Sequence, residues 1–338
     1  MHSIENICMF AAFLVSVPFY CAYLATLLKF RRKQPFSSDF FRMCFVWGLL
    51  DNVGIINQWF LFKFTQFGWF GVPVVVKMNP KFWAKVANLT TWYCGLSASH
   101  FVVAVAFNRL TRMAFPLQHQ LIWTGNFVRL CFALVLGSTI FMLAPMAGSE
   151  MTYLIDNSTG QLGPSVFLNQ QVHVLYYAFG TLHAIGCSVL SLFLYALLLI
   201  CVRLNKVAPS SGANVTHCED TQMRVVERKM VLFGLTMATL LSVISVYLAL
   251  MATTKDEAKM RLYLRIRGIF VDIFFWINPY LTLALSATVR EHFKAFVLRR
   301  RLQEEQTAVM DVRLMPVPSQ PNRSRLMPRA ALVSQTHF

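Results

Sequence analysis

Apolar residues fill seven long stretches of this chain, and short polar segments separate them. The stretches run over residues 7–28, 43–62, 86–107, 130–147, 172–202, 230–252 and 268–287. An apolar helix of about 20 residues spans the hydrocarbon layer of a bilayer and satisfies its own backbone hydrogen bonds there. The pattern therefore predicts an all-α membrane protein, a seven-transmembrane helix bundle within residues 1–289.

The segment after the seventh stretch has a different pattern. Between residues 290 and 302, Phe293, Phe296 and Val297 share one helical face and cations surround it, as in a helix that lies in the membrane interface. The sequence predicts a short interfacial helix there. Residues 303–338 carry scattered Pro and Arg and predict a disordered cytoplasmic tail.

Positive charges orient the predicted bundle. Five cations follow the first stretch and none precedes it: Lys29, Arg31, Arg32, Lys33 and Arg42. Positive loops resist translocation, and the first helix usually sets the orientation. The N-terminus is therefore predicted outside, with the chain in the plasma membrane. This topology exposes Asn157, in Asn-Ser-Thr, as a glycosylation acceptor on the second outer loop.

Composition narrows the possible functions. Hydrophobic residues make up 56% of the chain, its mean hydropathy is +0.52 and its formal net charge is +16. The cations lie beside helix ends, where anionic lipid is the expected partner, and this argues against a nucleic-acid-binding protein. No cysteine has metal-ligand spacing, and no nucleophile and base have credible spacing, so we expect no metal, no cofactor and no enzyme activity.

Two aspartates interrupt the apolar stretches, Asp51 in the second and Asp272 in the seventh. An ionisable group at the bilayer centre costs at least about 2.5 kcal/mol, so it marks either a functional site or a hydrogen-bonded packing contact, and both interpretations stay open. Asn278 precedes a proline that breaks the helical ladder. Asp51 and Asn278 are therefore a weak candidate for a water or sodium site, and Arg265 is the expected partner of Asp272 because the two lie seven residues apart.

The third stretch carries a stripe of small and polar residues. Asn88, Thr91 or Trp92, Gly95, Ser99, Val102, Ala106 and Arg109 recur at steps of three and four, which places them on one helical face. Small residues pack well between membrane helices, and this explains the inner half of the stripe. The outer half is expected to line a cavity.

The motif at the inner end of this stretch resembles a known family. Asn108-Arg109-Leu110, with a proline seven residues after the arginine, resembles the Asp-Arg-Tyr signature of rhodopsin-like receptors. The run from Phe107 to Trp123 resembles the nematode serpentine chemoreceptors of the class gamma superfamily, in which Asn-Arg, Thr, Phe-Pro and Ile-Trp recur in this order. The resemblance implies a chemosensory G-protein-coupled receptor for an odorant or pheromone, in the plasma membrane or a sensory cilium.

The resemblance also assigns roles to residues. It implies a ligand pocket between the outer halves of helices three, five, six and seven that includes Thr91, Trp92, His183, Asp272 and Trp276. It implies a surface for a heterotrimeric G protein that includes Asn108, Arg109, Arg112, Arg228 and Lys229. Asn108 replaces the acidic partner of the signature arginine, which puts a charge-paired inactive lock in doubt. The seventh stretch has no lysine, which excludes a retinal Schiff base.

Two other classes remain as alternatives. A ligand-gated chemosensory channel of the insect type also has seven spans, but its N-terminus would lie inside. A membrane carrier or enzyme should cluster several ionisable residues within its spans. This chain has scattered single ones: Asp51, His100, His183 and Asp272.

Overall fold

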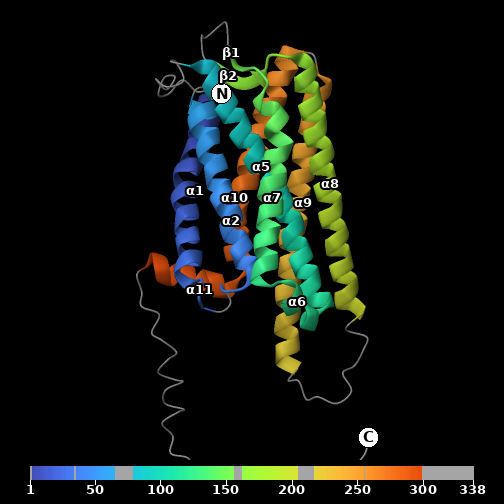
Figure 1. Cartoon of the computed structure of the whole chain (residues 1–338). Coiled ribbons are helices and arrows are strands. Elements are labelled where there is room, and N and C mark those ends of the chain that lie inside the picture. Colours follow the sequence, from blue (N-terminus) through green and yellow to red (C-terminus); the bar gives the residue numbers. More distant parts are fainter. Residues whose placement is uncertain are drawn as a thin grey trace, which may run out of the picture.

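A computed structural model of the chain describes residues 2–33, 36–64, 79–155, 162–204, 217–254 and 256–298. Within these ranges, long helices run side by side in one bundle (Figure 1). They are α1 (His2–Phe30), α2 (Asp39–Asn57) with its π-helical continuation η1 (Gln58–Lys63), α5 (Pro80–Ala114), α7 (Gly125–Ala147), α8 (Gln170–Leu204), α9 (His217–Thr253) and α10 (Glu257–Leu285).

Six of these helices, all except α2, are long and apolar enough by themselves to cross a bilayer. α2 carries Asp39, Arg42 and Asp51 in its 19 residues, and η1 extends it toward the outer end. Large apolar side chains also cover the outside of the bundle: Phe141 is 82% exposed and Leu182 is 71% exposed. Such a surface suits lipid rather than water. The predicted seven-helix bundle is confirmed.

The first, third, fourth, fifth and sixth predicted spans each lie within one helix, and the second lies within α2 and η1. The seventh, 268–287, continues two residues past the end of α10 at Leu285. Most helices extend beyond their predicted spans. α5 begins at Pro80, directly after Asn79, whose side chain accepts a hydrogen bond from the Phe82 amide at 3.1 Å. α9 begins at His217, inside the polar segment 205–222 that the sequence predicts to be a loop. Helical turns outside the membrane need no apolar residues, so hydropathy alone does not detect them.

The outer end of the bundle carries an element that the sequence pattern does not predict. Strands β1 (Met151–Ile155) and β2 (Leu162–Phe167) form an antiparallel hairpin with Thr152 opposite Val166. It lies at the same end as the N-terminus of α1 (Figure 1). The predicted glycosylation site Asn157 falls between the strands, outside the described residues, as does the predicted tail 303–338.

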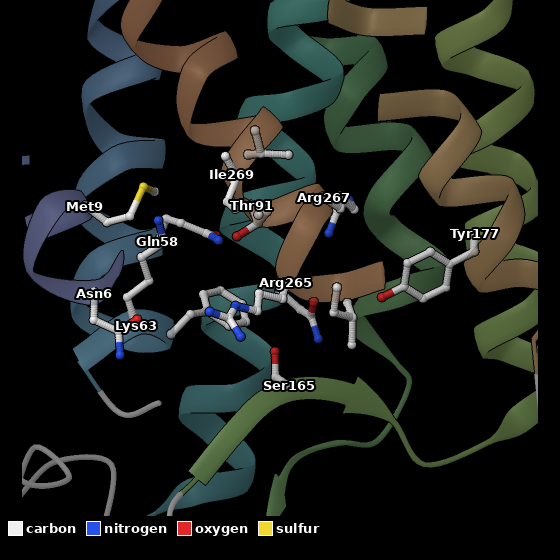
Figure 2. Close-up of a pocket in the computed structure, with 15 residues that line it drawn as sticks. Asn6, Met9, Gln58, Lys63, Thr91, Ser165, Tyr177, Arg265, Arg267 and Ile269 are labelled. Carbon is white, nitrogen blue, oxygen red and sulfur yellow. The ribbon is translucent and has the colours of Figure 1, made fainter. Parts of the chain in front are cut away.

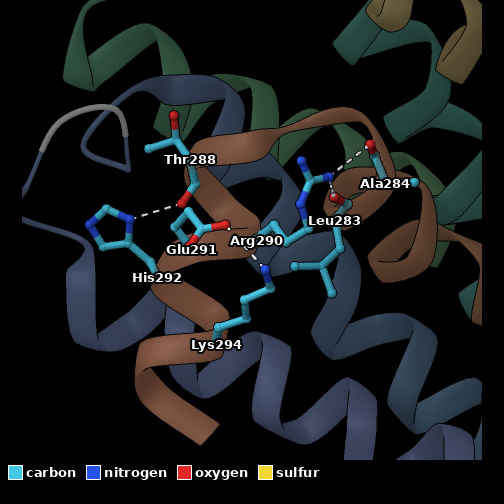
Figure 3. Close-up of polar contacts among 7 residues, drawn as sticks. All are labelled: Leu283, Ala284, Thr288, Arg290, Glu291, His292 and Lys294. Atoms are coloured by element: carbon cyan, nitrogen blue, oxygen red, sulfur yellow. Dashed lines mark hydrogen bonds and ion pairs between the residues drawn. The ribbon is translucent and has the colours of Figure 1, made fainter. Parts of the chain in front are cut away.

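At the opposite end, helix α11 (Ala287–Val297) crosses the bundle beneath α1 (Figure 1). The Ser286 hydroxyl accepts a hydrogen bond from the Val289 amide at 3.3 Å and so caps α11. Arg290 donates to the carbonyl oxygens of Leu283 and Ala284 at 3.0 and 3.2 Å (Figure 3). Because these carbonyls are unpaired at the end of α10, Arg290 fixes the turn between the two helices.

The apolar face of α11 packs on α1. The rings of Phe293 and Phe19 lie 5.2 Å apart, and those of His292 and Phe30 lie 4.7 Å apart. The sequence predicts an interfacial helix over residues 290–302, and the structure has the helix α11 in this region. It begins earlier, at Ala287, and the residues after Leu298 are outside the described part.

Candidate ligand pocket and coupling end

The outer pocket lies just beneath the β hairpin, between α1, η1, α5, α8 and α10. Its polar lining residues are Asn6, Gln58, Lys63, Asn88, Thr91, Ser165, Tyr177, Arg265 and Arg267. In Figure 2 the hairpin is at the bottom of the view. Gln58 and Lys63 from η1 and Arg265 from α10 lie above Ser165 of β2 there. Polar side chains that line a pocket between helices suit a hydrogen-bonding ligand group.

A deeper pocket adjoins the outer one. Thr91, Arg267 and Val271 line both. The rest of its lining is mostly apolar: Trp92, Gly95, Leu96, Ser99, Gly180, His183, Ala184, Leu241, Ile244, Leu248, Phe274 and Phe275. The two pockets together offer a polar chamber near the surface and an apolar chamber below it.

Four buried polar side-chain atoms of the pocket linings have no hydrogen-bond partner in the described structure: Ser165 Oγ, His183 Nδ1 and two N–H donors. Arg267 lies with its guanidinium carbon 5.9 Å from the centre of the Trp92 ring, and its buried Nε has no hydrogen-bond acceptor in the described structure. The buried Nδ2 of Asn88 likewise lacks one. Buried polar groups are usually satisfied, so these two donors indicate an acceptor supplied from outside the chain.

Asp272 makes a different ion pair from the expected one. It is fully buried and pairs with Lys63 of η1, not with Arg265. The Lys63 ammonium also lies 4.6 Å from the centre of the Trp59 ring. Lys63 directly follows the predicted span 43–62, so hydropathy alone predicts that it lies in an outer loop, whereas the π-helical turn carries it into the bundle. The expected neutralisation by Arg265 is therefore wrong.

The other residues assigned to the ligand pocket have different positions. Trp92 and His183 line the deeper pocket. Thr91 lines both pockets, but its hydroxyl donates to the Ala87 carbonyl and accepts from the Asn57 amide, each at 2.9 Å. Trp276 is buried at 9% exposure and lines neither pocket. Their roles in ligand binding stay predictions.

Asp51 and Asn278 meet through a third residue. The Tyr20 hydroxyl donates to Asp51 Oδ2 at 2.6 Å and accepts from Asn278 Nδ2 at 3.4 Å. Thr282 then donates to the carbonyl oxygen of Asn278 at 2.9 Å. The chain itself thus links the two residues through Tyr20, which the sequence reasoning missed. The proposed sodium or water stays a prediction.

At the inner end, Arg109 lies over an aromatic ring. Its guanidinium carbon is 3.7 Å from the centre of the Phe40 ring at the start of α2. The neighbouring Asn108 is buried at 2% exposure, and among the described ion pairs none includes Arg109. A cation–π contact thus holds the arginine where an acidic partner is absent.

The remaining coupling residues are only partly described. Arg112 is exposed on the last turn of α5. Arg228 and Lys229 belong to α9, but their side chains lie outside the described part of the structure. The structure therefore places Arg109 and Arg112 at one end of the bundle and leaves the contribution of α9 as a prediction.

The motif from Phe107 to Trp123 folds back on itself through the short helix α6 (Pro116–Ile122). Trp123 Nε1 donates to the Thr111 hydroxyl at 2.8 Å, and His119 Nδ1 lies 3.1 Å from the same oxygen. The Phe107 and Trp123 rings are 6.0 Å apart. Burial lowers the pKa of His119, and the charge of Arg112 lowers it further. The contacts of His119 and Trp123 with Thr111 therefore hold the second inner loop against α5.

The bundle has the fold of rhodopsin-like G-protein-coupled receptors. It superposes on squid rhodopsin with a TM-score of 0.61, over 90% of each chain and at 11% identity, which shows the fold alone. The family model described as serpentine type 7TM GPCR chemoreceptor Srv matches residues 9–298. The chain therefore belongs to the Srv family of serpentine chemoreceptors.

A relative is the serpentine receptor class V-1 of Caenorhabditis elegans. It is 25% identical over 203 residues, which make up 59% of this chain and 64% of the relative. The chain thus matches less than two thirds of that relative's length. The protein is a multi-pass membrane receptor rather than an enzyme, as predicted. The predicted kinship with serpentine chemoreceptors is confirmed, while the assignment to class gamma is not.

Proposed function

We propose that this protein is a chemosensory receptor of the plasma membrane that binds a small molecule in the two outer pockets and signals to a heterotrimeric G protein. The observation that carries the proposal is the set of unpartnered polar atoms in the pocket walls, among them the N–H donors of Arg267 and Asn88. Sensory cilia are its proposed location, and a place in the class gamma superfamily stays part of the proposal.

The chemistry of the lining favours a ligand with two parts. A carboxylate or another strong acceptor group would accept hydrogen bonds from Arg267 and Asn88, since ionised acceptors make the stronger bonds with guanidinium groups. An apolar tail would lie against Trp92, Leu241 and Phe275 in the deeper pocket. Asp272 then contributes indirectly, because it neutralises Lys63 beside the ligand.

The coupling step follows from the inner end. A ligand shifts a receptor between two helix packings only through its different affinity for them. In the packing described here, Arg109 is held over Phe40. We propose that the second packing frees this guanidinium for the G-protein α-subunit, with Arg112, Arg228 and Lys229 around it.

The ligand proposal is tested in cells that express the chain. Aliphatic and aromatic carboxylates are screened beside their neutral amides, with a second messenger as the readout. We expect carboxylates to activate, and we expect Arg267→Gln to raise the effective concentration at least about tenfold, because a charge-assisted bond contributes about 1.5–3 kcal/mol. Lys259→Gln, on an exposed turn of α10, is the matched control. Equal responses of wild type and Arg267→Gln contradict the assignment.

The coupling proposal needs a separate variant. Arg109→Ala should abolish the second-messenger response at unchanged surface expression, while Arg129→Ala, exposed at the inner end of α7, should retain it. A ligand-evoked current that persists in Arg109→Ala and without functional G protein would instead support the channel alternative.

A further inference from the structure

Three metal-ligand side chains meet between α5 and α8. His100 Nε2 lies 3.0 Å from His183 Nε2, and Cys187 Sγ lies 3.7 Å from the same His183 nitrogen. The three donor atoms all lie within 4.8 Å of one another. His183 and Cys187 stand four residues apart on one face of α8, and His100 faces them from α5. Sequence spacing alone does not reveal this cluster because it joins two helices.

Two of the three donor–donor separations fit one shared cation, and the third lies within 4.8 Å. Two nitrogens about 2.0 Å from a tetrahedral ion lie about 3.3 Å apart, and a nitrogen and a thiolate sulfur on such an ion lie about 3.6 Å apart. The observed separations of 3.0 and 3.7 Å are close to these values. Small rotations of the side chains would complete the geometry.

The surroundings orient one of the ligands, His100, whereas the buried Nδ1 of His183 has no hydrogen-bond partner in the described structure. His100 Nδ1 lies 3.4 Å from the hydroxyl of Thr139 on α7, which itself donates to the Val135 carbonyl at 2.8 Å. The Thr139 oxygen can thus accept a hydrogen bond from Nδ1–H of His100, and this tautomer leaves the Nε2 lone pair of His100 for an ion. A hydrogen-bonded second ring nitrogen is the usual arrangement for a metal-bound histidine.

We propose that His100, His183 and Cys187 bind a thiophilic d10 cation, Cu+ in preference to Zn2+. Thiolate and imidazole are the donors that such ions favour. Binding replaces the Cys187 thiol proton by the metal, and the proton leaves to water. The complex with Cu+ is then neutral, whereas Zn2+ leaves one positive charge in an apolar bundle, where uncompensated charge is costly.

The site is linked to the ligand pocket. His183 lines the deeper pocket, and that pocket shares Thr91, Arg267 and Val271 with the outer one. Three protein ligands leave a coordination position that a sulfur or nitrogen donor of a small molecule can fill. Ion binding itself needs neither an agonist nor a G protein, so it stands apart from the signalling proposal.

The site is tested with the purified full chain in lipid nanodiscs under reducing conditions, with Cu+ or Zn2+ delivered from competing chelators of known affinity. We expect one tight Cu+ site that weakens at least about tenfold in His183→Gln and Cys187→Ser. Cys201→Ser, on the same helix and outside the cluster, is the control and should bind as wild type does. A Cu+ site that is absent, or unchanged in Cys187→Ser, overturns the proposal and leaves only a histidine–histidine hydrogen bond. A site that prefers Zn2+ overturns the choice of ion.

A second measurement needs no variant and so avoids loss of folding. The unmodified chain is alkylated with a small membrane-permeant thiol reagent with and without Cu+, and each cysteine is quantified by peptide mass spectrometry. Bound Cu+ should slow alkylation of Cys187 at least about tenfold and leave Cys201 unchanged, because a metal-bound thiolate is not free to react. Equal rates at Cys187 with and without the ion count against the site.

Discussion

The buried pair of Lys63 and Asp272 joins two helices far apart in sequence. Both side chains are almost fully buried, at 8% and 0% exposure. In a low-dielectric interior, removal of one partner leaves the other charge uncompensated, whereas removal of both partners can be nearly neutral. The packing of η1 against α10 should therefore be stable only when both charges are present or both are removed.

This dependence gives a prediction for three variants. Asp272→Asn and Lys63→Met alone should each destabilise the receptor by about 3–5 kcal/mol, while the double variant should recover most of this loss. The readout is the melting temperature and the monodisperse yield of detergent-solubilised protein. Losses that simply add in the double variant would show that the two charges do not act as a pair.

For single residues, the sequence identified one member of each buried polar pair but not its partner. Asp272 stood out because it interrupts an apolar stretch. Its partner Lys63 directly follows a predicted span, and Arg267 directly precedes one, so hydropathy assigned both to loops. A long cation can bury its stem and reach inward from a helix end, and composition does not reveal its direction. Asp51 was found in the same way, and its partner Tyr20 was missed.

Among the helices, α5 and α8 approach closely where the ligand pocket forms. A Cβ atom added at Gly180 of α8 would lie 2.5 Å from Cη2 and Cζ3 of Trp92. Real Cβ atoms do not come this near, so a larger residue must move the indole. Trp92 lines the deeper pocket, and its ring also carries the contact with Arg267.

We therefore predict that Gly180→Ala destabilises the receptor by about 1–3 kcal/mol and changes the ligand response. Gly186→Ala on the same helix is the matched control, because an added Cβ meets nothing within 4 Å there. Thermal melting and dose–response curves of both variants provide the test. Identical behaviour of the two variants would show that Trp92 moves without consequence.

The types of the long elements followed from the sequence, and the exceptions have physical reasons. Membrane helices show themselves because every residue in the hydrocarbon layer must be apolar or paired. The hairpin of β1 and β2 lies at the membrane surface, where no such requirement holds and short strands leave a weak pattern. The outer pocket depends on it, since Ser165 lies in β2.

At the scale of the whole molecule, the two ends of the described chain lie at opposite ends of the helix bundle. The N-terminus of α1 lies beside the hairpin, and α11 lies at the other end of the bundle (Figure 1). The count of cations around the first span predicts that the hairpin end lies outside the cell.

This orientation predicts a glycan on Asn157. Glycosidase treatment should increase the electrophoretic mobility of the wild type and leave Asn157→Gln unchanged, and an epitope at Met1 should react with antibody on intact cells. An epitope at Met1 that is protected on intact cells, together with an accessible one at Phe338, would reverse the topology and remove the basis for the receptor assignment.

The comparison with squid rhodopsin shows what a pattern alone can specify. At 11% identity the two chains share a TM-score of 0.61, because apolar helix length and small-residue contacts suffice to set the bundle. The pockets depend instead on single side chains such as Arg267 and Asn88, whose directions only the packed structure gives. The fold was thus predictable from the sequence, and most partners within the site were not.

The contacts of Thr111 with His119 and Trp123 hold the second inner loop in shape before any partner arrives. A binding surface that is already ordered loses little chain entropy on association. We predict that the piece from Phe107 to Phe127, exchanged between related receptors, carries its choice of intracellular partner with it, because the Phe107–Trp123 contact is exchanged along with it.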